Sequence, residues 1–243
     1  MRYLLKFSYD GSNFSGFQKQ KGHRTIEQEL EIALTRINND KKTKVVATGR
    51  TDKGVHALCQ YGHADIDVEI SCYKLKRAMN SYLPDDIHII STETVDKDFH
   101  ARYNVKSKKY KYLINIGEYN PIERNYIYQH NRNLNIKAMK EGINYFLGEH
   151  DFRAFVKDNK EKDNCVRTIT KVEIEKDNDM MIISFEGNGF LQYQVRNMVG
   201  TLIKVGEEKI EPINVKEILD SKNRPPSTKT APAEGLYLVD VKY

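Results

Sequence analysis

The stretch VVATGRTDKGVHALCQYGHADI, residues 45–66, combines an apolar run, a glycine-bounded turn and a second strand-like run. The pattern predicts a strand over residues 44–48 and another over residues 58–67, joined by the turn at residues 49–54. This pair of strands with a tight turn is the centre from which the rest of the fold is built. The flanking sequence shows which elements cover it.

Helical patterns lie on both sides of this pair. Upstream, Thr25 and Gln28 have the spacing of a capping box, followed by apolar residues at helical spacing. Downstream, Pro84 ends a second helical pattern. The first part of the chain therefore follows the order β-α-β-β-α-β, with elements expected at residues 2–9, 26–37, 44–48, 58–67, 73–83 and 87–95.

The second part of the chain repeats this order. Elements are expected at residues 107–116, 135–147, 166–175, 180–186, 192–205, 215–219 and 236–241. Two such units predict an α+β fold of two tandem ferredoxin-like (split β-α-β) halves. We expect mostly antiparallel sheets, joined into one extended sheet with the helices on one face. The predicted domains are residues 1–102 and 103–243, divided near a basic stretch.

Composition limits the class of protein. Of the 243 residues, 39% are hydrophobic and 30% are charged, which is typical of a globular chain. No apolar run approaches the roughly 18 residues of a membrane span. The N-terminus has no apolar signal core and the three cysteines form no paired spacing, so we expect a cytoplasmic protein. The net charge of +5 permits an anionic partner without requiring one.

Asp52 poses a chemical question, because Arg50 and Lys53 flank it in the turn. The turn lacks the Gly-Lys-Ser/Thr ending of a Walker loop and the third glycine of a dinucleotide fingerprint. One interpretation is a turn in which Asp52 caps its own backbone. The other is a nucleophilic carboxylate, kept ionised by nearby cations and aimed by a rigid turn. A glycosidase fits less well, because it needs a second acid at a set distance. Residue types alone leave the first two open.

A zinc site is a further alternative, suggested by His56, Cys59 and His63. If residues 58–67 form a strand, Cys59 and His63 lie about 13 Å apart along it. Two groups at that separation do not share one ion. We therefore interpret this segment as a polar strand with a hydrogen-bonded histidine, and predict no metal site.

The segment RYNVKSKKYKY, residues 102–112, interleaves cations with tyrosines and contains no acid. On a strand, Tyr110 and Tyr112 point to one face and Lys109 to the other. One interpretation is a solvated edge strand that lysines protect from aggregation. The other is a nucleic-acid contact in which cations bind phosphates and rings stack on unpaired bases. Both stay open on these residues alone.

The segment GNGFLQYQVRNMVG, residues 187–200, places Arg196 at the border of a buried helical stripe. An arginine in that position needs an anionic partner. A structural salt bridge to a glutamate satisfies this need, and so does a pairing with Asp52.

The chain resembles the TruA-type tRNA pseudouridine synthases along nearly its whole length. The most specific match is GRTDKGVHA at residues 49–57. The others, in the same order as in the family, are FSGFQ (14–18), NSYLPDDI (80–87), DFHAR (98–102), KYKY (109–112), residues 190–200 and AEGLYL (233–238). The family usually has tryptophan where this chain has Phe17, and this chain contains no tryptophan.

The resemblance implies a function. It implies isomerisation of uridine to pseudouridine in the anticodon stem-loop of tRNA, at positions 38–40, without a metal or an organic cofactor. It also implies a homodimer. Because some lineages contain several such synthases, another structured RNA such as ribosomal RNA is an alternative target, and a non-catalytic RNA-binding factor is a remote alternative.

The resemblance also assigns roles to individual residues. Asp52 matches the nucleophile, Tyr110 the tyrosine that lies against the target base, and Arg196 the arginine that pairs with the aspartate. Attack at the ribose C1′ and attack at the uracil C6 both remain open. Residues expected to bind the substrate are Arg50, which helps displace the base, Leu236, which lines the uracil pocket, and Lys53, Lys109 and Arg102.

Overall fold

The computed structural model describes residues 1–156, 164–223, 225 and 228–243. These residues form five α-helices and a large sheet of ten strands, which confirms the predicted α+β class. The chain divides into two compact units, one made of Met1–Lys106 with Leu238–Tyr243 and the other of Ser107–Tyr237. The domain boundary predicted between residues 102 and 103 stays a prediction. None of the helices in the described residues is long and apolar enough to cross a membrane.

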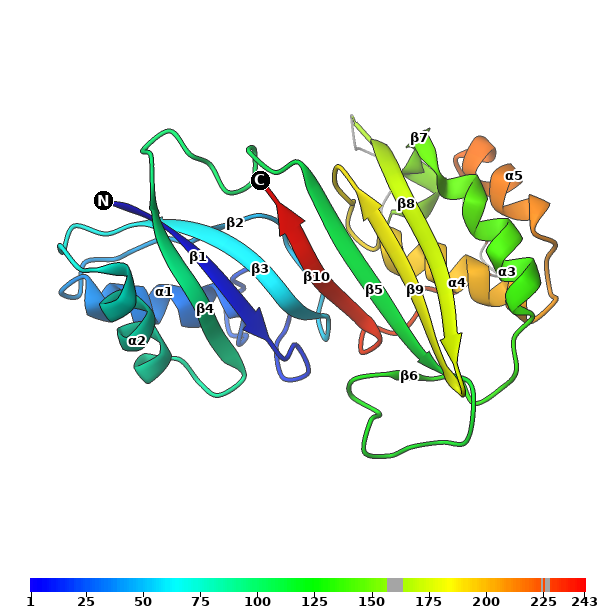
Figure 1. Cartoon of the computed structure of the whole chain (residues 1–243), viewed down its shortest axis with the longest axis horizontal. Helices are drawn as coiled ribbons and strands as arrows, with labels where there is room; N and C mark the ends of the chain where they lie inside the picture. Colours follow the sequence, from blue (N-terminus) through cyan, green and yellow to red (C-terminus); the bar gives the residue numbers. More distant parts are fainter. Residues whose placement is uncertain (157–163, 224, 226–227) are drawn as a thin grey trace. The chain divides into compact units, whose positions relative to one another are not determined.

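The first unit has the predicted β-α-β-β-α-β order. Strand β1 lies between β3 and β4 and is antiparallel to both (Figure 1). The short strand β2 pairs with β3. The elements are β1 (Arg2–Tyr9), α1 (Ile26–Ile37), β2 (Val46–Ala47), β3 (His56–Asp65), α2 (Cys72–Tyr82) and β4 (Ile87–Val95).

The core of the first unit follows from the alternation along β1. Every second side chain of this strand is buried, at Tyr3, Leu5, Phe7 and Tyr9. Alternate side chains of a strand share one face, so this face is the covered one. The helices contribute the fully buried residues Leu30, Ala33 and Leu34 from α1 and Leu75 and Met79 from α2.

The predicted capping box at the start of α1 is wrong. Thr25 is the N-cap, but its side chain makes no cap hydrogen bond, and its hydroxyl has no partner within the described residues. The first N–H groups of the helix donate instead to backbone carbonyls, Ile26 to Gly16 (3.4 Å) and Glu27 to Phe17 (3.0 Å). These carbonyls satisfy the donors that a capping side chain usually serves, so α1 is tied to the preceding loop.

The strand predicted over residues 44–48 is shorter than expected. Strand β2 covers only Val46 and Ala47. The N–H of Val45 donates to the Glu31 carboxylate of α1 (3.4 Å), so a side chain rather than a neighbouring strand is its partner. Local alternation does not reveal this choice.

The second unit contains the other strands and helices, except that β10 belongs to the first unit from Leu238 onward. Antiparallel pairing gives the strand order β5-β9-β8-β7, with β8 and β9 forming a hairpin and β6 pairing in parallel with β5 (Figure 1). Strands β6 and β7 were not predicted; both are very short. The elements are β5 (Ser107–Asn115), β6 (Tyr128–Gln129), α3 (Ile136–Ile143), a 3₁₀ turn (Asn144–Phe146), β7 (Gly148–Asp151), a second 3₁₀ turn (Phe152–Phe155), β8 (Val166–Asp177), β9 (Met180–Gly187), α4 (Gln194–Gly206), α5 (Ile213–Ser221) and β10 (Leu236–Lys242).

Helix α4 is the most buried helix segment of this unit. Met198, Val199 and Leu202 are fully buried along it. The helix begins at Gln194 rather than at the predicted residue 192, because Tyr193 has a left-handed backbone (φ 65°). A non-glycine residue in that region is uncommon, and Tyr193 lies close to Arg196 in the chain.

Candidate active site

The Asp52 carboxylate stands in the turn that joins β2 to β3. Asp52 is half-buried, whereas its neighbour Thr51 is buried and Lys53 is exposed. The Asp52 carbonyl accepts a hydrogen bond from the Val55 N–H (3.2 Å), which closes the turn. The side chain therefore stands on a short, internally bonded turn, between a buried residue and a solvated one.

Buried polar groups hold this turn from β1 and β3. The Tyr9 hydroxyl lies 2.8 Å from the Thr51 hydroxyl. The Gln60 side-chain amide donates to the Gly49 carbonyl (3.0 Å). Burial raises the pKa of Tyr9 well above its usual value, although the side chains of Thr51 and Gln60 partly offset the effect. Tyr9 therefore stays a neutral hydrogen-bonding group that fixes the turn.

The loop before α1 holds the turn from the other side. The Phe17 N–H donates to the Thr51 carbonyl (3.1 Å). Gly16 has a φ of 99°, and a Cβ there would lie 3.1 Å from the Thr51 carbonyl oxygen and 3.2 Å from the Lys53 nitrogen. Glycine thus provides both the left-handed conformation and the close approach. Through this loop, the start of α1 and the Asp52 turn form one hydrogen-bonded assembly.

The Thr51→Val variant tests the support of the turn. Removing the hydroxyl takes away a buried partner of Tyr9, so we expect the free energy of unfolding to fall by about 1–3 kcal/mol. With Asp52 as the predicted nucleophile, we expect the catalytic rate at saturating substrate to fall at least about 10-fold, because small displacements of a catalytic group are costly. The Thr51→Ser variant keeps the hydroxyl and is the control. Equal rates for the valine and serine variants would contradict the prediction; urea unfolding and single-turnover assays measure both quantities.

His56 is the first residue of β3, and its side chain contacts the segment that follows β1. It is buried, and its Nδ1 accepts a hydrogen bond from the Gly11 N–H (3.1 Å). A Cβ on Gly11 would lie 2.1 Å from the Val55 carbonyl oxygen, so the two segments meet backbone to backbone. Nδ1 also lies 3.2 Å from the Asp10 carboxylate. This histidine is therefore a packing and hydrogen-bonding residue beside the turn.

In the second unit, Tyr110 lies on β5 as predicted. Tyr110 and Tyr112 are buried, whereas Lys109 and Lys111 on the alternate positions are half-exposed. The Tyr110 ring meets the Phe190 ring edge to face, with centroids 5.2 Å apart. This confirms the predicted separation of rings and cations on the two faces of the strand.

Arg196 lies half-buried on α4, at the border of the buried stripe as predicted. Its Nε donates to the Ala231 carbonyl (2.8 Å), and the Ala231 N–H donates to the Arg196 carbonyl (3.0 Å). Its guanidinium carbon lies 5.0 Å from the centre of the Tyr193 ring, within cation–π range. The left-handed backbone of Tyr193 places that ring beside Arg196. The side chain is thus oriented by two neighbours of its own unit.

Leu236 is buried and follows a segment that is held on both sides. The Tyr112 hydroxyl donates to the Pro232 carbonyl (2.7 Å), and the Leu113 N–H donates to the Gly235 carbonyl (2.8 Å). A Cβ on Gly235 would lie 2.7 Å from the Leu113 carbonyl oxygen. Residues 231–236 are therefore packed between groups of β5 and α4 of the same unit.

The remaining predicted residues are at least partly exposed to solvent. Arg50, Lys53 and Arg102 are exposed in the first unit, and Lys109 is half-exposed in the second. The predicted pairing of Asp52 with Arg196 stays a prediction. Within its own unit, each of these two residues is held by the contacts described above.

The interpretation of His63 as a hydrogen-bonded strand histidine is confirmed. His63 is buried on β3, and its Nδ1 accepts a hydrogen bond from the Ala101 N–H (3.1 Å). Cys59, on the same strand, is a buried free thiol. In the part of the chain that the structure describes, no group of three His, Cys, Asp or Glu residues is arranged to hold a metal ion.

The burial of His63 predicts a pH dependence of stability. Burial, aided by Arg2 and His100, lowers the pKa of His63 to about 4, against about 6.5 in an unfolded chain. Protonation of His63 therefore favours unfolding. The contribution of neutral His63 to the free energy of unfolding is fully present above about pH 6.5 and is lost as the pH falls toward 4. The His63→Gln variant keeps a hydrogen-bond acceptor but does not titrate. Between pH 7 and pH 4.5, we expect its free energy of unfolding to fall by about 2 kcal/mol less than that of the wild type. Urea unfolding at both pH values measures this; parallel losses would contradict it.

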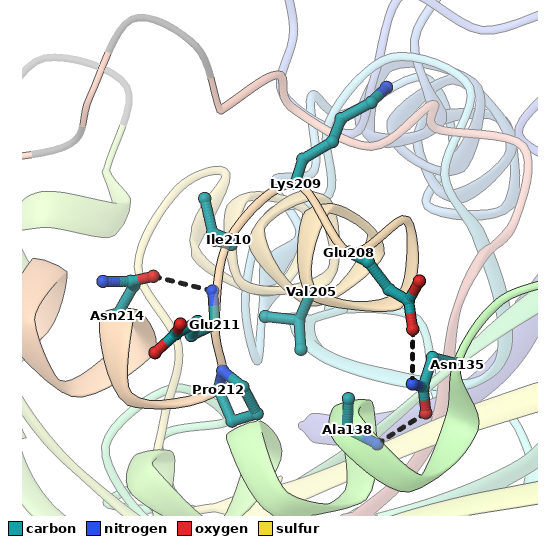
Figure 2. A pocket seen from close by; sticks show the side chains of 9 residues that line it. All are labelled: Asn135, Ala138, Val205, Glu208, Lys209, Ile210, Glu211, Pro212 and Asn214. Carbon is teal, nitrogen blue, oxygen red and sulfur yellow. Dashed lines mark hydrogen bonds between the residues drawn. The ribbon is translucent and has the colours of Figure 1, made fainter.

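A surface pocket of about 650 Å³ lies elsewhere in the second unit. It is lined by residues at the start of α3, the end of α4 and the segment before α5, and none of the predicted site residues lines it. Figure 2 shows Asn135 bonded both to Glu208 (2.8 Å) and to the Ala138 N–H (3.0 Å). The polar groups of Asn135 thus cap α3 and connect it to the end of α4. The candidate site does not lie in this pocket.

Comparison with known proteins gives the class. The sequence profile of the family described as tRNA pseudouridine synthase matches residues 7–104 and 143–243. The chain therefore belongs to the tRNA pseudouridine synthase family, and it is an RNA pseudouridine synthase, which is an isomerase acting on tRNA.

Individual relatives agree with this family. Proteins named tRNA pseudouridine synthase A from Streptococcus pyogenes serotype M49 (strain NZ131) and serotype M1 are each 43% identical over 246 residues, covering 100% of this chain and 99% of theirs. A chain in a structure titled "Crystal Structure of a Cbf5-Nop10-Gar1 Complex" is 13% identical, with a TM-score of 0.32 over 82% of this chain and 54% of that chain.

Sequence reasoning missed the groups that hold the turn and the arginine. Tyr9, Gln60 and Phe17 belong to regular strand or loop patterns, and Tyr193 lies where a helix was expected to have begun. The available signal was the glycine of the loop at residue 16. This signal does not point to the Asp52 turn without the pairing of β1 with β3.

Proposed function

We propose that this enzyme converts uridine to pseudouridine in the anticodon stem-loop of tRNA, at positions 38–40, with Asp52 as the nucleophile. One observation carries the assignment of the nucleophile. Asp52 stands half-buried on a turn that Tyr9 and Gln60 fix from the strands beneath, in a chain that belongs to the tRNA pseudouridine synthase family. The turn interpretation and the nucleophile interpretation are thereby combined, since the turn is what aims the acid.

The reaction requires an extruded base and an ionised acid. The target uridine leaves its stack, because an enzyme cannot reach the reacting atoms inside it. The Asp52 carboxylate then attacks the ribose C1′ or the uracil C6. The C1′–N1 bond breaks, the uracil turns, and a C1′–C5 bond forms. The bond from Asp52 to C1′ or C6 breaks again, which returns the free carboxylate. N1 gains a proton and C5 loses one, so the overall change is an isomerisation.

Tyr110 and Arg196 supply the remaining chemistry of the proposal. Tyr110 lies against the uracil and is placed to remove the C5 proton. The Arg196 guanidinium pairs with Asp52, keeping the carboxylate ionised and oriented in a site from which water is excluded. Leu236 provides an apolar wall for the uracil. This proposal rests on the resemblance and is supported by the orientation that Tyr193 and Ala231 give to Arg196.

Exposed cations bind the RNA backbone in this proposal. Arg50 helps to displace the base, and Lys53, Lys109 and Arg102 neutralise phosphates. Their exposure fits this role, because a solvated cation reaches a phosphate without losing a buried partner. We also propose that the enzyme works in the cytoplasm as a homodimer, as the resemblance implies; analytical ultracentrifugation tests the dimer.

Mapping of pseudouridines tests the proposed target. RNA from cells that lack the gene should lose the pseudouridines of the tRNA anticodon arm and regain them when the gene is restored. Retained anticodon-arm pseudouridines together with a lost ribosomal site would assign the enzyme to ribosomal RNA. An unchanged map, with RNA still bound by the purified protein, would favour the non-catalytic alternative.

A further inference from the structure

An exposed stack of rings stands on the first unit, next to the predicted RNA-binding residue Arg102. Tyr103 is 77% exposed, although it is a large aromatic residue. Its ring lies parallel to the His100 ring, with centroids 4.1 Å apart and an interplanar angle of 25°. His100 in turn meets the edge of the buried His63 ring at 5.0 Å. The His100 ring of this stack therefore contacts the buried His63 of β3, whereas the Tyr103 ring is exposed to solvent.

The turn that presents Tyr103 is closed by its own hydrogen bonds. The N–H groups of Tyr103 and Asn104 both donate to the His100 carbonyl (3.0 Å each). The His100 N–H donates to the Asn104 side chain (2.6 Å). A ring held in this way loses little conformational freedom when a ligand stacks on it, which favours binding.

The same turn is fixed to the body of the unit. The Ala101 N–H donates to His63 Nδ1 (3.1 Å), and the Ala101 carbonyl accepts from the Tyr243 hydroxyl (3.0 Å). The Arg2 guanidinium donates to the Phe99 carbonyl (2.9 Å). Burial of the Tyr243 phenol raises its pKa to about 12, so this hydroxyl keeps its proton across the physiological range.

Charges beside the stack favour an anionic ligand with planar groups. Arg102 and Lys106 are exposed on either side of Tyr103 along the chain, and Lys97 is exposed before it. Asp96 and Asp98 are also exposed in this segment and offset part of the positive charge. A single solvated ring between cations and amides fits an RNA base with its phosphates better than the broad apolar face of a protein partner.

We propose that the His100–Tyr103 stack is a platform for one unpaired base of the RNA substrate. The proposal rests on the proposed function, because it takes its ligand to be the same RNA. Stacking on an aromatic ring tolerates any base, since every base has a π-face. The platform therefore positions a nucleotide that is not itself modified, with Arg102 available to its phosphate.

A hydrogen-bond relay connects the platform to the Asp52 turn. The Tyr243 hydroxyl lies 2.7 Å from the Thr48 hydroxyl, and Thr48 directly precedes the turn at residues 49–54. The same hydroxyl donates to the Ala101 carbonyl beneath the platform. Both segments belong to the first unit. A base held on Tyr103 is thus kept in a fixed relation to Asp52, which sets the register of the RNA.

Affinity for a tRNA transcript tests the platform. Base stacking on a single ring predicts that Tyr103→Ala raises the Kd by about 5- to 150-fold, while Tyr103→Phe keeps the wild-type Kd. The matched control is Tyr73→Ala, because Tyr73 is 68% exposed on α2 of the same unit. We expect this control to bind like the wild type in fluorescence anisotropy titrations. Both positions are at the surface, so the three variants keep the fold.

Fluorescence gives a second readout, because the chain contains no tryptophan. In Tyr103→Trp the single indole reports on position 103, and stacking of a base should quench its emission in a saturable way. Tyr73→Trp should show no quenching. An unchanged Kd for Tyr103→Ala, or an unquenched Tyr103→Trp, overturns the platform. If the wild type binds RNA and Tyr103→Trp is quenched, but the wild type forms no pseudouridine in the anticodon arm, the proposed function fails and the platform stands.

Discussion

Asp52→Asn should abolish pseudouridine formation while RNA is still bound. Loss of a covalent nucleophile lowers the rate constant on the order of 10⁴-fold or more. Asparagine has nearly the shape of aspartate but is neutral and a poor nucleophile, so the turn and the RNA contacts are kept. Single-turnover assays with a tRNA transcript measure the rate, and filter binding measures the affinity.

The matched control for this variant is Asp85→Asn. Asp85 is exposed between α2 and β4, so the change removes the same charge at a position with no assigned role. We expect a wild-type rate for this control. Persistent product formation by Asp52→Asn would refute the nucleophile assignment. Loss of RNA binding together with activity would instead give Asp52 a structural role.

Arg196→Ala should lower the rate constant by about 10²- to 10³-fold, the usual cost of removing one group that stabilises charge in an active site. Loss of the guanidinium also removes its hydrogen bond to the Ala231 carbonyl. Arg196→Lys keeps the positive charge but not the planar fork of donors, so we expect an intermediate rate. This ranking separates an electrostatic role from simple packing.

A cation on the same helix provides the control for Arg196. Lys204 lies near the end of α4, where it pairs with Glu207 (3.1 Å). We expect Lys204→Ala to react at the wild-type rate. If Arg196→Ala and Lys204→Ala reacted equally fast while both stayed folded, the proposed pairing of Arg196 with Asp52 would have no catalytic meaning.

Much of the fold was predictable from local patterns. The alternation from Arg2 to Tyr9 and the helical spacing from Ile26 to Ile37 gave both elements with correct bounds. The predictions failed where a group from another part of the chain takes the hydrogen bond that a local group was expected to make. The Thr25 side chain makes no cap hydrogen bond because carbonyls of the preceding loop accept from the first N–H groups of the helix. Strand β2 begins later than predicted because the Glu31 carboxylate accepts from the Val45 N–H.

The site was predictable only in part. Residue types and their spacing singled out Asp52 and Arg196, and the resemblance assigned roles to them. The phenol of Tyr9 and the amide of Gln60 reach the turn only after β1 pairs with β3, which no local pattern encodes. The left-handed backbone conformation of Tyr193 could not be predicted, because the neighbouring residues have helical spacing.

The membership of Leu238–Tyr243 in the first unit has a consequence for synthesis on the ribosome. These residues are translated after the whole of Ser107–Tyr237, yet they belong with Met1–Lys106. Until they emerge, the β3 side of the nascent first unit lacks its neighbouring strand β10. Unsatisfied strand edges in nascent chains are prone to aggregate. We therefore expect the first unit to complete its folding only after residues 238–243 have been made.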